Sequence, residues 1–144
     1  MRLIITICLL LVVGCSRSSK IEDSPISLTT NDIIRVETDR GGAAIIQFTT
    51  FGPDQEALYR WRYRAPQSKT VQSGTGRVVE SFDRKAKSDG NYEVVPNAEH
   101  DTTVRAGDLM LEWSYGSDTN GFLYFDPSDT KIQLLDGDNF ERKL

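Results

Sequence analysis

Cysteine is almost absent from this chain of 144 residues, which contains only Cys8 and Cys15. Because no thiol follows residue 15, the rest of the chain has no disulfide, no cysteine nucleophile and no cysteine-ligated zinc. Small domains outside the cytoplasm often depend on disulfides. A domain of about 120 residues buries roughly two thirds of its unfolded surface and can rely on its hydrophobic core instead.

The chain also lacks an excess of positive charge. It has 17 Lys and Arg residues against 21 Asp and Glu residues, which gives a net charge of −4. Binding to nucleic acid requires a basic face, and electrostatic adhesion to anionic lipid requires a basic patch. We therefore expect no nucleic-acid partner and no electrostatic adhesion to lipid.

Candidates for catalysis are few. His100 is the only histidine, and it lies between Glu99 and Asp101 in a polar stretch. No nucleophile elbow of the form G-x-S-x-G occurs in the chain. A single histidine in a loop is most often a solvated polar residue. The sequence therefore predicts that the protein is not an enzyme and has no catalytic residues.

No apolar run is long enough for a transmembrane helix. The longest run, residues 3–13, has about eleven residues, whereas a spanning helix needs about 20. It follows Arg2 and has the length of the apolar region of a signal peptide. Residues 12–15, Val-Val-Gly-Cys, resemble the lipobox of bacterial lipoproteins, in which two aliphatic residues and a small residue precede the lipidated cysteine.

This resemblance covers the first fifteen residues and implies how the protein is anchored. Residues 1–14 would be removed as a signal peptide, and Cys15 would receive a diacylglyceryl group and often a further acyl chain such as palmitate. Each buried methylene contributes about 0.8 kcal/mol, so two chains give stable anchoring. The position after Cys15 is Ser16 rather than the Asp that usually retains such lipoproteins in the inner membrane. The resemblance therefore implies the outer membrane, facing the periplasm or the cell surface.

The segment after the cysteine is rich in serine and charge, and its composition is typical of a flexible tether. We assign residues 15–30 to a lipidated tether and residues 31–144 to a single all-β domain. In this domain apolar residues recur at every second position, which predicts strands. The predicted strands are residues 32–39, 43–51, 57–64, 76–83, 92–95, 109–115, 122–125 and 130–135, with 102–104 as a further short one.

The segments between these strands are predicted as turns and loops. Residues 67–75 are predicted as a polar loop, residues 84–91 as a charged turn and residues 136–144 as a frayed polar tail. About eight short strands with regularly spaced turns, and no helix beyond the signal peptide, predict an antiparallel sandwich or a small barrel.

The segment 57–64 alternates aromatic residues with arginines. Successive side chains of a strand point to opposite faces, so Tyr59, Trp61 and Tyr63 share one face and Arg60, Arg62 and Arg64 share the other. The aromatic face is predicted to pack in the core. The arginines would either pair with acidic residues on a neighbouring strand or bind an anionic ligand or an acidic partner. Arginine suits the second role because its planar group binds carboxylate or phosphate with two hydrogen bonds.

A second aromatic group is spread over residues 109–125. Its members would pack in the core and across strands, or would form a platform on which sugar rings stack, with Trp113, Tyr115 and Tyr124 as the platform residues.

The acidic turns 126–129 and 136–141 contain oxygens of the kind that calcium binds, but neither matches an EF-hand loop. Asp, Asn and Gly are also ordinary turn residues, so we expect no metal and no cofactor.

Together these features predict a lipid-anchored protein of the cell envelope that acts by binding. The favoured function is a binding or accessory subunit of an envelope protein assembly, with Arg60, Arg62 and Arg64 as contacts and open sheet edges available for strand addition. The alternative is a module that binds peptidoglycan or another polysaccharide. The lesser alternative is an envelope hydrolase.

Overall fold

The structure is a computed structural model that describes residues 19–21, 23–137, 139–141 and 144. The predicted signal peptide and Cys15 lie outside the described residues. Within them every regular element is a strand, and the bounds are β1 (Ser19–Ile21), β2 (Ile26–Thr29), β3 (Ile33–Thr38), β4 (Ala43–Gly52), β5 (Glu56–Arg64), β6 (Val71–Val79), β7 (Phe82–Ala86), β8 (Tyr92–Pro96), β9 (Thr103–Ala106), β10 (Leu109–Ser117), β11 (Asn120–Tyr124) and β12 (Thr130–Leu135). The part of the chain described here contains no helix long and apolar enough to cross a membrane.

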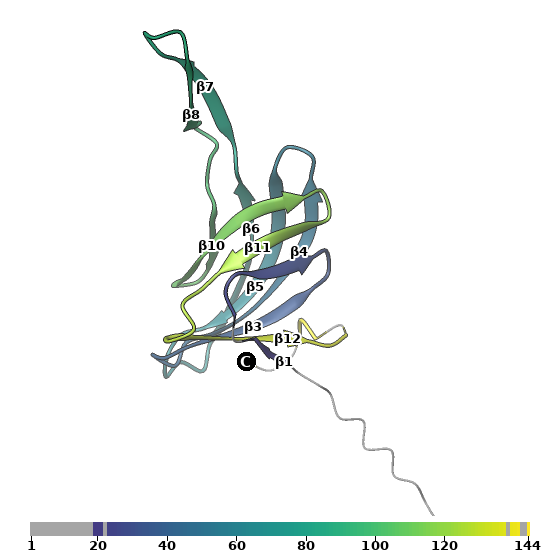
Figure 1. The fold of residues 1–144 in the computed structure, drawn as a ribbon. Helices are drawn as coiled ribbons and strands as arrows, with labels where there is room; N and C mark the ends of the chain where they lie inside the picture. Colours follow the sequence, from purple (N-terminus) through teal and green to yellow (C-terminus); the bar gives the residue numbers. More distant parts are fainter. Residues whose placement is uncertain (1–18, 22, 138, 142–143) are drawn as a thin grey trace, which may run out of the picture.

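Two antiparallel sheets pack face to face as a β-sandwich (Figure 1). Sheet A has six strands in the order β1-β12-β3-β4-β5-β6, and sheet B has four in the order β2-β11-β10-β9. The remaining strands, β7 and β8, pair only with each other. We call this hairpin, residues 82–96, the arm. The predicted all-β antiparallel class is confirmed, and of the two predicted architectures the sandwich is the one observed.

The space between the sheets is filled by the inward-facing side chains of both. The predicted aromatic face of residues 57–64 is confirmed, because Tyr59 and Tyr63 are buried in this core and Trp61 packs against it. The largest fully buried side chain is Trp113 of sheet B. On sheet A, Phe48 stacks on Phe51 with ring centroids 5.7 Å apart.

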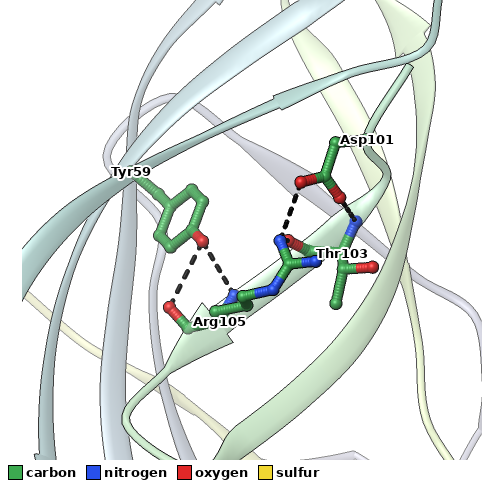
Figure 2. A network of polar contacts seen from close by, with 4 residues as sticks. All are labelled: Tyr59, Asp101, Thr103 and Arg105. Carbon is green, nitrogen blue, oxygen red and sulfur yellow. Dashed lines mark hydrogen bonds and ion pairs between the residues drawn. The ribbon is translucent and has the colours of Figure 1, made fainter. Parts of the chain in front are cut away.

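Tyr59 also joins the two sheets by hydrogen bonds (Figure 2). Its hydroxyl donates to the carbonyl of Arg105 at 3.2 Å and accepts from the backbone N–H of Arg105 at 2.7 Å. The Arg105 side chain in turn donates to Asp101 at 2.8 Å, and Asp101 accepts from the N–H of Thr103 at 3.0 Å. The hydrogen bond from Arg105 is the main cause that lowers the pKa of Asp101. Tyr59 of sheet A thereby satisfies backbone groups on the outer edge of β9.

The structure differs from the prediction at both edges of the sandwich. Strands β1 and β2 fall within the segment predicted as a tether, where β1 pairs with β12 and β2 pairs with β11. The predicted loop 67–75 is also wrong, since β6 begins at Val71 and pairs with β5 along its whole length. Two glycines of β6 lie beneath aromatic rings of β5. A Cβ atom on Gly76 would lie 2.2 Å from the Cζ atom of Tyr59, so the glycine fits the ring that packs there.

The described residues of the predicted frayed tail, 136–144, include two that are buried, which corrects a further prediction. Phe140 and Leu144 are buried on the outer face of sheet A, the face turned away from sheet B. They form a second apolar cluster there with Ile33, Ala43, Ile45 and Leu135. This cluster explains why β4 is buried on both of its faces between Ala43 and Phe48.

Candidate binding surfaces

The three arginines of β5 lie on the outer face of sheet A, as their alternation predicts. Their cross-strand neighbours are Gln47, Ile45 and Ala43 on β4, and Thr75, Ser73 and Val71 on β6. None of these six residues is acidic. The prediction that the arginines pair with acidic residues across the strand is therefore wrong.

The C-terminal residues occupy part of this arginine face instead. The Arg60 guanidinium lies over the ring of Phe140, 3.9 Å from its centroid, and Arg60 Nε donates to Gln47 Oε1 at 2.6 Å. Arg62 donates to the carbonyl of Phe140 at 3.1 Å and lies 3.9 Å from the carboxylate of Glu141. Two of the three predicted contact residues thus hold the chain's own C-terminal residues against sheet A.

Arg64 differs from the other two arginines. Its Nε atom is buried and has no hydrogen-bond partner among the residues described. Its neighbours across the strands, Ala43 and Val71, carry no polar side-chain atom that could accept a hydrogen bond. The structure brings Arg60, Arg62 and Arg64 to one face, as predicted, but does not leave them as an open row.

The three predicted platform residues do not form one surface. Trp113 is only 1% exposed, and Gly121 packs beneath it so closely that a Cβ atom would lie 2.3 Å from the indole Nε1. Tyr115 meets Trp113 edge to face at 6.4 Å on the inner side of sheet B. Tyr124 lies on the outer side, where its hydroxyl is 3.3 Å from that of Ser114. A sugar ring could therefore reach Tyr124 but not the buried indole.

The residues considered for catalysis and metal binding have local structural roles. His100 Nδ1 lies 3.2 Å from the carbonyl oxygen of Ser81, and its ring packs against Phe82 with centroids 4.8 Å apart. Asp126 accepts hydrogen bonds from Ser128 at its turn, which lower the pKa of Asp126. Over the described ranges, no three Asp, Glu, His or Cys side chains gather closely enough to hold a metal ion.

The arm is a candidate surface that the sequence analysis did not identify. It projects beyond the sandwich at the end opposite β1, in the upper part of Figure 1. The register of β7 and β8 places Phe82, Ala86, Tyr92, Val94 and Pro96 on one face together with Arg84. The large apolar members of this face are strongly exposed, at 45% for Phe82, 69% for Tyr92 and 64% for Val94. The arm is therefore amphipathic, and its apolar face is uncovered apart from the contact of Phe82 with His100.

The root of the arm is fixed to the sandwich. Val79 and Asp101 exchange two backbone hydrogen bonds, of 2.8 and 2.9 Å, immediately before the arm begins and after it ends. Asn97 then donates to Ser81 twice, from its backbone at 3.1 Å and from its side chain at 2.5 Å. These contacts set the direction of the arm, while its tip extends into solvent.

Sequence patterns contained part of the signal for the arm. Residues 92–95 read as a strand, and the charged residues around Asp89 and Gly90 read as a turn. An apolar face that packs on a core and an apolar face that is exposed to solvent have the same alternation, so the pattern could not show that the arm is exposed.

A scan against protein-family models and searches of curated proteins and of solved structures found no match to this chain.

Proposed function

We propose that this protein is an accessory binding subunit of an envelope protein assembly. It is held at the membrane by lipid on Cys15 and contacts a protein partner through the arm. The observation that carries the proposal is the apolar face of the arm, where Phe82, Tyr92 and Val94 are exposed on one face of a hairpin that pairs with no other strand. This proposal moves the expected contact from the arginines of β5 to the arm.

The energetics of an isolated hairpin favour this role. A two-stranded hairpin in water is at best marginally stable, because it buries little apolar surface. A partner that covers Tyr92 and Val94 would supply the missing burial, at about 25 cal/mol for each Å² of apolar surface removed from water. Exposed tyrosine is also among the residue types that contribute most to binding at protein interfaces. Both outer edges of the hairpin also have backbone groups available for an added strand.

The position of the arm suits a protein anchored at its N-terminus. β1 is the first described strand, and it lies at the end of the sandwich away from the arm (Figure 1). A lipid anchor ahead of β1 would leave the arm directed away from the membrane. In that orientation the apolar face of the arm contacts a partner at a distance from the lipid surface.

The test is a crosslink and pull-down of the tagged protein from intact membranes, with mass spectrometry of the captured proteins. We compare the wild type with the double variant Tyr92→Ser, Val94→Ser. Leu58→Ser is the matched control, because Leu58 is 39% exposed on β5 and lies neither on the arm nor in another proposed site. Cys15→Ser tests the anchor separately, by release of the protein from the membrane fraction.

We expect a protein in stoichiometric amount with the wild type and with Leu58→Ser, and its loss with the double variant. Equal recovery with the double variant would exclude the arm as the contact. Membrane retention of Cys15→Ser would exclude the lipid anchor without bearing on the arm.

A glycan-binding module is the second candidate, and Tyr124 is the observation in its favour. Tyr124 is exposed on the outer face of sheet B and pairs across the strands with Glu112, so an aromatic ring and a carboxylate lie together there. Retention on purified cell wall that Tyr124→Ala abolishes, with no captured protein, would replace the first proposal with this one.

A further inference from the structure

A hollow of about 610 Å³ lies at the end of the sandwich where several turns meet. Its walls include Asp39 from the turn between β3 and β4, Asp108 from the turn between β9 and β10, and Asp129 from the turn before β12. Tyr63 of β5 also lines the hollow, and Leu109 and Met110 supply an apolar side. Cavities of this size are typical of small-molecule sites.

Tyr63 is a largely buried residue whose hydroxyl is accessible from this hollow. The residue is 5% exposed, and its ring is covered by Gly107, where a Cβ atom would lie 2.0 Å from the ring. Gly107 has a φ of +61°, and as the first residue of a two-residue hairpin turn it can approach the ring closely. The Tyr63 hydroxyl lies near Gly42 and makes no hydrogen bond with any residue in the described ranges. The hydroxyl oxygen is not sealed from solvent, so a ligand that enters the hollow can reach it and form a hydrogen bond with it.

The acidic residues that line the hollow favour a positively charged ligand. Asp39, Asp108 and Asp129 are exposed, and Arg40 is the cation that lines the hollow with them. Asp129 accepts a hydrogen bond from the Thr130 hydroxyl at 2.7 Å, whereas no described side chain donates to the carboxylates of Asp39 and Asp108. Two carboxylates with free acceptor capacity therefore line the same hollow as Tyr63.

Burial raises the pKa of Tyr63, and the nearby charge of Asp108 raises it further. The hydroxyl is therefore protonated at neutral pH, where it can still accept a hydrogen bond through its oxygen lone pairs. The arrangement offers a cation three acceptors of different character, two of them charged.

We propose that this hollow binds an alkylammonium group. The ammonium would donate to the carboxylates of Asp108 and Asp39 and to the hydroxyl of Tyr63, while its alkyl stem packs on Leu109 and Met110. A divalent metal fits less well, since the described acidic residues do not converge into a metal-binding group. The alkylammonium can belong to a free amine or to a lysine side chain of a peptide, and the site does not depend on the arm.

The experiment is a titration of the isotopically labelled protein followed by backbone amide chemical shifts. The probe is n-hexylammonium, with n-hexanol as its neutral counterpart and hexanoate as its anionic counterpart. A second series uses a short peptide with one central lysine and the same peptide with that lysine acetylated. The variants are Asp108→Asn and Tyr63→Phe, and Asp54→Asn is the control because it removes an exposed carboxylate outside the hollow.

We expect n-hexylammonium to shift the amides around Asp108 and Tyr63, and neither counterpart to match it. Asp108→Asn should weaken binding about five- to tenfold, because it removes a charged hydrogen-bond acceptor, and Tyr63→Phe about two- to fivefold. Asp54→Asn should bind as the wild type does. A preference for the lysine peptide over its acetylated form would assign the group to a protein, and binding of the free amine alone would assign it to a small molecule.

Equal binding of n-hexanol and n-hexylammonium would overturn the proposal, as would shifts that Asp108→Asn and Tyr63→Phe both leave unchanged. Tyr63→Phe keeps the packed ring, so it still reports on the hydroxyl if the other variant fails to fold.

Discussion

The sandwich and the arm are built from the same element, an antiparallel strand with alternating side chains, but they bury it differently. β4 of the sandwich is buried on both faces from Ala43 to Phe48, whereas every residue of β7 is exposed. The sandwich therefore contains the interactions that stabilise it. The arm keeps its shape through its own hydrogen bonds and those at its root, and its apolar side chains remain available to another molecule. This difference separates the part of the chain that forms the core from the part for which we propose a binding role.

The largest expected effect is on the stability of the sandwich, through a substitution of Trp113. Trp113→Ala should lower the free energy of unfolding by about 3–5 kcal/mol, because it leaves a cavity in the centre of the core. Urea denaturation measures the change. Met110→Ala on the same strand is the control, and it should alter stability by less than about 0.5 kcal/mol, since Met110 is exposed. A loss below about 1 kcal/mol at Trp113 would mean that the core does not depend on its largest side chain.

A smaller effect is expected at the contact between the sheets. Tyr59→Phe should cost about 1–2 kcal/mol, because it removes the hydrogen bonds with both backbone groups of Arg105 and keeps the ring (Figure 2). The same denaturation curve measures it. Arg105→Lys is a useful comparison, since it changes the side chain and leaves those backbone groups in place. An unchanged stability for Tyr59→Phe would show that the hydrogen bonds of Tyr59 do not contribute to holding the sheets together.

Tyr59 also makes the stability of the folded protein depend on pH. Burial is the main cause that raises the pKa of Tyr59 in the folded protein above its usual value near 10. The folded state therefore holds its phenolic proton more tightly than the unfolded state. This contribution to stability is present below about pH 10 and is lost as the pH rises through the folded pKa. Stability should fall less steeply above about pH 10 in Tyr59→Phe than in the wild type, with Tyr63 present in both.

The smallest effect is expected on the arm. Val94→Ser should change the free energy of unfolding of the sandwich by less than about 0.5 kcal/mol, because Val94 is exposed and contacts no core cluster. Hydrogen exchange sharpens the comparison, since the amides of β7 and β8 should exchange well before those of β4. Slow exchange throughout the arm, or a large loss of stability with Val94→Ser, would show that the arm is part of the folding unit.

The alternation of residues 57–64 was sufficient to predict the strand and both of its faces, because a buried aromatic face and a polar face have a clear period of two. β6 was not predictable in the same way. Its residues Gly74 and Gly76 weaken a strand signal, and their fit beneath Trp61 and Tyr59 is decided by the neighbouring strand. Only the assembled sheet shows why glycine is suitable there.

The candidate sites were harder to predict than the fold. Trp113 and Tyr124 are close in sequence, but the register of β10 and β11 places them on opposite faces of sheet B. Phe140 follows Arg62 by 78 positions, so no local pattern links the ring to the arginine face that it covers. The hollow beside Tyr63 collects residues from several turns, and a single sequence does not reveal which turns meet.

The paired backbone hydrogen bonds between Val79 and Asp101 have an evolutionary consequence. They complete the connection between β6 and β9 before the arm begins, so the two sheets do not depend on what is inserted between these residues. Selection can lengthen, shorten or rewrite this insertion without repacking the core. The sandwich can thus keep its fold while the insertion changes in length and sequence.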